Sequence, residues 1–140
     1  MNAATDDDTS RTSYHASYNV PITHATLAAL RASLNIPYHV NVTLTVDAED
    51  MPPDEQIDDA ETVAWIREEL SSGNDAAWFC ATVTVSDEDA EGIDHLGGCS
   101  SESFNDFMTI DGNLPDMVAA AFAEYTTDAA RLAVTGRVVT

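Results

Sequence analysis

The chain has 140 residues, of which 25 are acidic and only five are basic, giving a formal net charge of −20. This length suffices for one domain with a buried core, and an apolar fraction of 44% favours a folded chain over a disordered one. The negative charge repels nucleic-acid phosphates and anionic membranes, so we expect direct binding to neither. The sequence also lacks an apolar run of 18 residues, and it therefore predicts no transmembrane helix.

The N-terminal segment 1–13 is polar and acidic. It predicts a disordered tail, followed by a single domain over 14–140. The segment has neither the basic nor the apolar region of a signal peptide, so we expect the protein in the cytoplasm of a host cell.

A short helix beginning near Thr23 is predicted by an apolar stripe of three leucines, and Pro37 prevents that helix from continuing. The stripe consists of Leu27, Leu30 and Leu34. Strict alternation then predicts a strand over 38–46 with one face in the core. Its core-facing residues are Tyr38, Val40, Val42, Leu44 and Val46.

A second helix is predicted over about 57–72, ended by Gly73. Its core stripe consists of Val63, Ile66 and Leu70. A second strand over 76–85 is apolar on both faces at its Trp78 end, so we place it centrally in the sheet. A third strand near 93–99 would complete a hairpin with it.

The last predicted helix begins near Asn113, which is a good helix cap, and Gly136 marks its end. Its apolar face consists of Met117, Val118, Ala121, Phe122 and Tyr125. The order of elements is αβαββα. It predicts an α+β fold in which two to four helices pack on about three mainly antiparallel strands.

The acidic stretch between the last two strands resembles a calcium loop in part. Asp87, Asp89, Glu91 and Gly92 match positions of an EF-hand loop, but Gly98 stands where that loop needs a bidentate carboxylate. Strands, not helices, are also predicted on both sides of the stretch. We therefore interpret it as a hairpin turn whose acids lie at the surface.

The two cysteines, Cys80 and Cys99, allow a disulfide, a metal pair or two free thiols, and buried free thiols are expected in the cytoplasm. His95 lies four residues before Cys99, so both would face the same side of an extended strand. No CxxC or HxxxH spacing supports a metal site, and no third group supports a nucleophile pair. The alternative to a site is a hairpin strand with one exposed histidine and one buried cysteine. We expect no metal, no cofactor and no enzymatic activity; an enzyme that uses His95 and Cys99 is the competing hypothesis.

The helix at 57–72 carries the candidate binding surface. At 100° per residue, five acids fall within one arc opposite the core stripe, and Trp65 falls within the same arc. These acids are Asp54, Asp58, Glu61, Glu68 and Glu69. A tryptophan among charges is typical of a binding hot spot, and carboxylates one turn apart lie about 5–6 Å from each other, near the spacing of phosphates on a strand. The alternative is that Trp65 lies against the prolines at 52–53.

The segments WFCATVTV, EGIDHLGGCSSESFNDF and LPDMVAAAF share a pattern of tryptophan, glycine, cysteine and Asp-Phe residues. The pattern consists of Trp78, Ala81, Val83, Gly92, Leu96 to Ser100, Asp106, Phe107 and Asp116 to Val118. With this pattern, over roughly 40 of the 140 residues, the chain resembles a family of small accessory proteins carried by phages and plasmids. The family has a tyrosine after the Cys-Ser pair, where this chain has Ser101.

The resemblance implies a mobile genetic element in a bacterial or archaeal host, and it assigns no activity and no catalytic residue. Such elements commonly encode small acidic proteins that block host defence, including antirestriction and anti-CRISPR inhibitors. We therefore expect a non-enzymatic nucleic-acid mimic, as a monomer or a homodimer, that binds a basic nucleic-acid-binding host protein or complex. The acids of the helix and Trp65 would form its surface, extended by Asp87, Glu88, Asp89 and Glu91.

The alternative is a small domain adapted to a halophilic host. Its acids would then serve only solubility in high salt, and its function would lie elsewhere.

Overall fold

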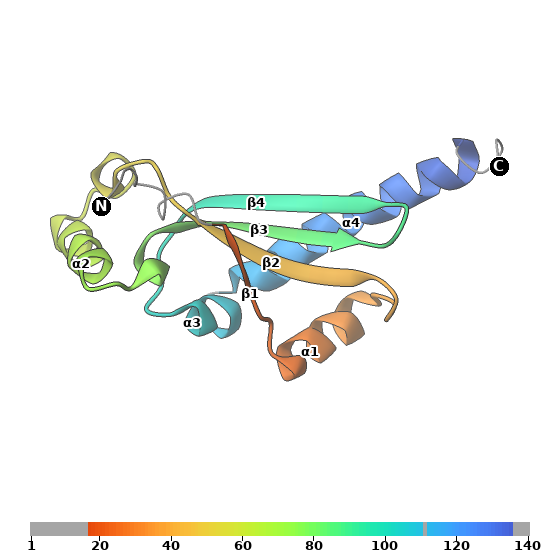
Figure 1. Cartoon of the computed structure of the whole chain (residues 1–140), viewed down its shortest axis with the longest axis horizontal. Helices are drawn as coiled ribbons and strands as arrows, with labels where there is room; N and C mark the ends of the chain where they lie inside the picture. The colour runs from red at the N-terminus through yellow and green to blue at the C-terminus, as the bar shows by residue number, and fades with distance from the viewer. Residues whose placement is uncertain (1–16, 111, 136–140) are drawn as a thin grey trace, which may run out of the picture.

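The computed structural model describes residues 17–110 and 112–135, which form a four-stranded antiparallel sheet with accompanying helices (Figure 1). The strands are β1 (Tyr18–Val20), β2 (Asn41–Ala48), β3 (Phe79–Ser86) and β4 (Glu91–Cys99), side by side in that order. The α-helices are α1 (His24–Leu34), α2 (Ala60–Ser71), α3 (Phe104–Thr109) and α4 (Asn113–Thr135). The predicted α+β class is confirmed, and the order of the main elements fits the prediction. The proposed tail over 1–13 and the helix end at Gly136 lie outside the described residues.

The strand count differs from the prediction, because β1 adds a fourth strand at one edge of the sheet. Its three residues pair with the segment 44–46 of β2, and only Val20 is buried. A strand of three residues with a single buried side chain has no alternation long enough to recognise in a sequence.

The main core lies between one face of the sheet and the helices. β2 and β3 alternate as predicted, and their inward residues are Val42, Leu44, Val46, Phe79, Ala81, Val83 and Val85. Leu30 of α1 and Val118 of α4 belong to the same buried cluster, so both helices cover this face. The rings of Phe79 and Phe107 meet edge to face, with centroids 5.1 Å apart. The opposite face of β2 and β3 carries mainly small polar side chains that are exposed or half-buried.

Two residues predicted for the core are exposed. Tyr38 is 89% exposed, because the strand begins only at Asn41, after a turn closed by the hydrogen bond from the Val40 N–H to the Pro37 carbonyl (3.1 Å). Leu70 is also exposed, because α2 buries only its middle, at Ile66.

The helix α4 lies against β4 at very short range. A Cβ atom at Gly92 would lie 2.0 Å from the carbonyl oxygen of Ala121 and 2.3 Å from the amide nitrogen of Tyr125. Only a residue without a side chain allows this approach.

Two carboxylates of α4 bind the backbone of β4. Asp128 accepts a hydrogen bond from the Glu91 N–H at 3.0 Å, and Glu124 accepts one from the Ile93 N–H at 2.7 Å. Unpaired N–H groups at a sheet edge invite pairing with other chains. The helix therefore covers part of the edge that β4 would otherwise expose.

We expect Gly92→Ala to destabilise the fold by about 3 kcal/mol or more, because its methyl group meets backbone atoms that cannot rotate away. Chemical denaturation measures the loss. Gly97→Ala in the same strand is the matched control: a Cβ there meets only the Glu49 side chain, at 3.1 Å, and should cost less than about 1 kcal/mol. Equal losses in the two variants would contradict the close approach of α4.

Candidate functional site

The acidic residues are distributed unevenly over the fold. Residues 47–75, from the end of β2 through α2, contain eleven acids and one base, a net charge of −10 out of −20. Residues 17–46, which form β1, α1 and most of β2, contain no Asp or Glu at all. We call residues 47–75 the acidic lobe. Figure 1 shows its helix α2 at one end of the sheet, away from α1.

A small second core holds the acidic lobe in place. Ile66 packs with Ala77 and Trp78 in a buried cluster, and Ile57 lies against it. The indole N–H of Trp78 donates to the Met51 carbonyl at 2.7 Å. This bond connects the loop before α2 to the start of β3, and it helps to fix the position of the acidic lobe relative to the sheet.

The five acids predicted on this surface divide into two groups. Three carboxylates are exposed and form no side-chain hydrogen bond or ion pair with any described residue: those of Asp58, Glu61 and Glu68. The other two are engaged. Asp54 accepts a hydrogen bond from Arg67 at 2.9 Å, and the half-buried Glu69 accepts one from the Asn74 amide at 2.9 Å.

Trp65 is half-buried against the second core. It also lines a hollow of about 400 Å³ together with Ser100, Ser101, Glu102, Asp106 and Ile110. Ile110 is 71% exposed. The acidic lobe therefore has an aromatic ring at its border, next to an exposed aliphatic side chain.

The acids between β3 and β4 lie at the opposite end of the sheet from α2 (Figure 1). The segment is a hairpin turn, as predicted, and Glu88, Asp89 and Glu91 are exposed. The structure does not bring them next to the acidic lobe, so they do not extend its surface.

Both carboxylate oxygens of Asp87 accept hydrogen bonds that stabilise the hairpin turn. Its Oδ2 accepts the Tyr125 hydroxyl at 2.6 Å, and its Oδ1 accepts the N–H groups of Asp89 and Ala90, each at 2.8 Å. The hydrogen bond from Tyr125, followed by those from the backbone, lowers the pKa of Asp87 to about 2. The same bond raises the pKa of Tyr125 to about 12.

Because the folded-state pKa of Asp87 lies below its ordinary value of 3.8, the stability from this turn is complete above about pH 4 and is lost as the pH falls through 2. We expect Tyr125→Phe to lower the melting temperature at pH 7. The difference in melting temperature between the variant and the wild type should become smaller between pH 4 and 2, because Asp87 then becomes protonated in both proteins. Thermal melts followed by circular dichroism measure it, and a gap that stays constant to pH 2 would contradict the charged hydrogen bond.

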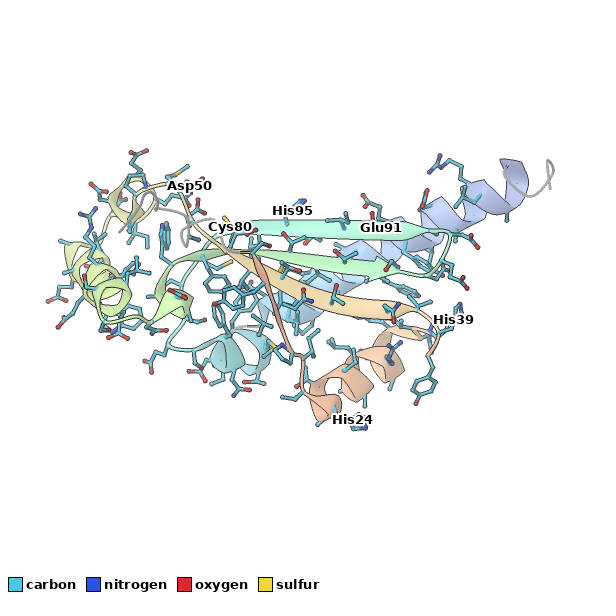
Figure 2. The ribbon with its side chains drawn as sticks, viewed as in Figure 1. His24, His39, Asp50, Cys80, Glu91 and His95 are labelled. Atoms are coloured by element: carbon cyan, nitrogen blue, oxygen red, sulfur yellow. The ribbon has the colours of Figure 1, made fainter. Side chains whose placement is uncertain are left out.

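A second polar hollow, of about 640 Å³, lies where β3 and β4 meet the loop after β2. Glu49 accepts the N–H of Gly98 at 2.6 Å and the thiol of Cys80 at 3.3 Å. His95 Nδ1 lies 2.9 Å from the Thr82 hydroxyl, and Figure 2 shows Cys80 and His95 on the neighbouring strands. Burial, followed by the hydrogen bond to Glu49, raises the pKa of Cys80 to about 11, so this thiol stays protonated at neutral pH. Sequence analysis missed Glu49, because no motif marks it.

The expectation that His95 and Cys99 face the same side is wrong, and the alternative of one exposed histidine and one buried cysteine is confirmed. Cys99 is buried in the main core, whereas His95 is exposed. The register between β3 and β4 shifts between Phe79 and Ala81, and Gly98 has a positive φ of 64°. An extra residue in one strand reverses the alternation of sides beyond it. No disulfide joins Cys80 and Cys99.

Comparison with protein-family models, with curated proteins and with solved structures finds no match to the chain. None of the helices within 17–110 and 112–135 has the length and apolar character that crossing a bilayer requires. In that same part of the chain, no three His, Cys, Asp or Glu side chains lie close enough to share a metal ion. The acidic lobe is the feature with the clearest binding chemistry.

Proposed function

We propose that the chain is a non-enzymatic binding protein whose acidic lobe occupies a basic, nucleic-acid-binding groove of another protein. The resemblance to accessory proteins of phages and plasmids suggests a host defence complex, of the restriction or CRISPR type, as the partner. The observation that carries the proposal is the concentration of half the net charge in residues 47–75.

The segregation of the acids favours binding over a general solubilising coat. A coat that keeps a protein hydrated in brine is needed wherever the surface meets solvent. Residues 17–46, however, include the exposed side of a whole helix without one carboxylate. A cluster of charge at one end instead creates a directional field, which draws a basic partner to that end and orients it.

Two of the free acids and the tryptophan lie on one face of α2. Glu61, Trp65 and Glu68 lie at positions i, i+4 and i+7 of the helix and so share a face, with Asp58 just before the helix begins. At 1.5 Å per residue, Glu61 and Glu68 stand about 10 Å apart along the axis. Anionic groups on this scale, with a ring between them, match a groove that holds phosphates and bases.

Neutralising the three free acids should release the partner. For Asp58→Asn, Glu61→Gln and Glu68→Gln combined, we expect the affinity to fall about tenfold or more at low salt, because the lost contacts are electrostatic. The difference should shrink near 1 M salt, where the Debye length is about 3 Å. The assay is displacement of fluorescent duplex DNA from purified restriction endonucleases and CRISPR effector complexes.

The matched control neutralises the hairpin acids. Glu88→Gln, Asp89→Asn and Glu91→Gln combined change the net charge by the same amount at the other end of the sheet, and this variant should displace DNA as the wild type does. Equal losses in the two triple variants would assign the effect to total charge and contradict a role for the acidic lobe. Failure of the wild type to displace DNA from any complex would refute the proposed function.

Thermal melts at a series of NaCl concentrations distinguish an acidic surface used for binding from one adapted to high salt. We expect a folded protein at about 0.05 M NaCl, with a melting temperature that rises to about 0.5 M and then levels off, because the Debye length is already about 10 Å at 0.1 M. A chain that folds only near 1 M salt would support the solubilising alternative instead.

A further inference from the structure

The hollow beside Trp65 combines an aromatic ring, an aliphatic side chain and two carboxylates. Trp65 belongs to α2, Ile110 directly follows α3, and the carboxylates are those of Glu102 and Asp106. Its volume of about 400 Å³ lies within the range of pockets that hold small ligands. The hollow therefore has room for one long side chain of another protein.

Hydrogen bonds hold the walls of this hollow together. The side-chain amide of Asn74 donates to the Glu69 carboxylate of α2 at 2.9 Å and to the Glu102 carbonyl at 3.0 Å. The Ser101 N–H donates to the Ala76 carbonyl at 2.8 Å. The segment that carries Glu102 is thus joined both to α2 and to the residues before β3. A wall that is already fixed loses little conformational freedom when a ligand binds.

The two carboxylates of the hollow lack a cation from the described part of the chain. Glu102 is exposed and Asp106 is half-buried, and neither forms a side-chain hydrogen bond or ion pair with a described residue. The described arginines, Arg31, Arg67 and Arg131, each bind an acceptor elsewhere in the fold, and the chain has no lysine. This arrangement favours a cation that another molecule supplies.

We propose that the hollow binds an arginine side chain of the protein that the acidic lobe contacts; the source of this arginine rests on the proposed function. A planar guanidinium can stack on the indole of Trp65 while its N–H groups donate in pairs to a carboxylate. The exposed Ile110 offers an apolar contact for the methylene groups of that side chain.

Charge and shape together select arginine over other occupants. A lysine ammonium is a compact, strongly hydrated charge without a flat face. A nucleotide base also stacks on tryptophan, but its phosphates would be repelled by a chain with a net charge of −20. Nucleic-acid-binding grooves carry arginines that contact phosphates and base edges. The carboxylates of the hollow would then take the place of a phosphate.

The test follows the indole N–H signals of the full chain in ¹H–¹⁵N NMR spectra. The chain has two tryptophans, and Trp65→Phe assigns their signals. The probe is N-acetyl-arginine methylamide, whose only charge is the guanidinium, and the matching lysine and citrulline compounds are its controls. We expect the arginine compound to shift the Trp65 signal to saturation and to bind about threefold or more tighter than the lysine compound. The uncharged citrulline compound should cause no shift. Trp78 is the internal control, because it is 3% exposed and its N–H is bound to the Met51 carbonyl.

Glu102→Gln combined with Asp106→Asn should weaken binding of the arginine compound about fivefold or more. The same variant should be weaker than the wild type in displacing DNA. Its matched control, Glu88→Gln combined with Asp89→Asn, removes the same charge at the hairpin turn and should change neither measurement. Circular dichroism checks that both variants are folded, and the comparison of arginine with lysine needs only the wild type.

Three results would overturn the arginine site: no shift of the Trp65 signal, equal affinity for the arginine and lysine compounds, or unchanged affinity in the folded Glu102→Gln, Asp106→Asn variant. Tighter binding of adenosine than of the arginine compound would assign the hollow to a base and also overturn it. A wild type that binds the arginine compound but displaces DNA from no complex refutes the function proposed for the acidic lobe and supports the arginine site. Displacement of DNA without arginine binding overturns this inference alone.

Discussion

The packing of α4 on β4 is the constraint on which the rest of the structure depends. A strand and a helix approach so closely at Gly92 that no other residue fits between them. This approach brings Glu124 and Asp128 to the backbone of β4 and Tyr125 to the carboxylate of Asp87. Three acids of a highly charged chain thereby serve as hydrogen-bond acceptors for backbone or tyrosine, and they close both the edge of the sheet and its hairpin turn.

The acidic residues of this protein have different roles that depend on where they lie in the fold. Asp87 and the acids of α4 stabilise the fold. The acids of the acidic lobe are held in place by a second core of Ile66, Ala77 and Trp78. That core is small, and the hydrogen bond from Trp78 to Met51 joins it to the loop before α2. Free carboxylates on a fixed support can bind a basic groove without first losing conformational freedom, which is the advantage of preorganisation.

The absence of acids from residues 17–46 leaves the region of α1 without carboxylates, whereas both ends of the sheet carry them (Figure 1). A partner attracted by the field of the acidic lobe is directed away from α1.

The sequence by itself determined the α+β class and the position of every long element, because strict alternation over β2 and β3 and the stripes of α1 and α4 are set by local periodicity. It also indicated that Glu61 and Glu68 of α2 face solvent. Only the tertiary structure decided which acids are free, because the partners of Asp54, Glu69 and Asp87 come from contacts that no local pattern encodes. It also decided that His95 and Cys99 point apart, since a bulge shifts the register of the strands. The distance between the acidic lobe and the hairpin turn likewise follows from the length of the sheet that separates them, not from their separation along the chain.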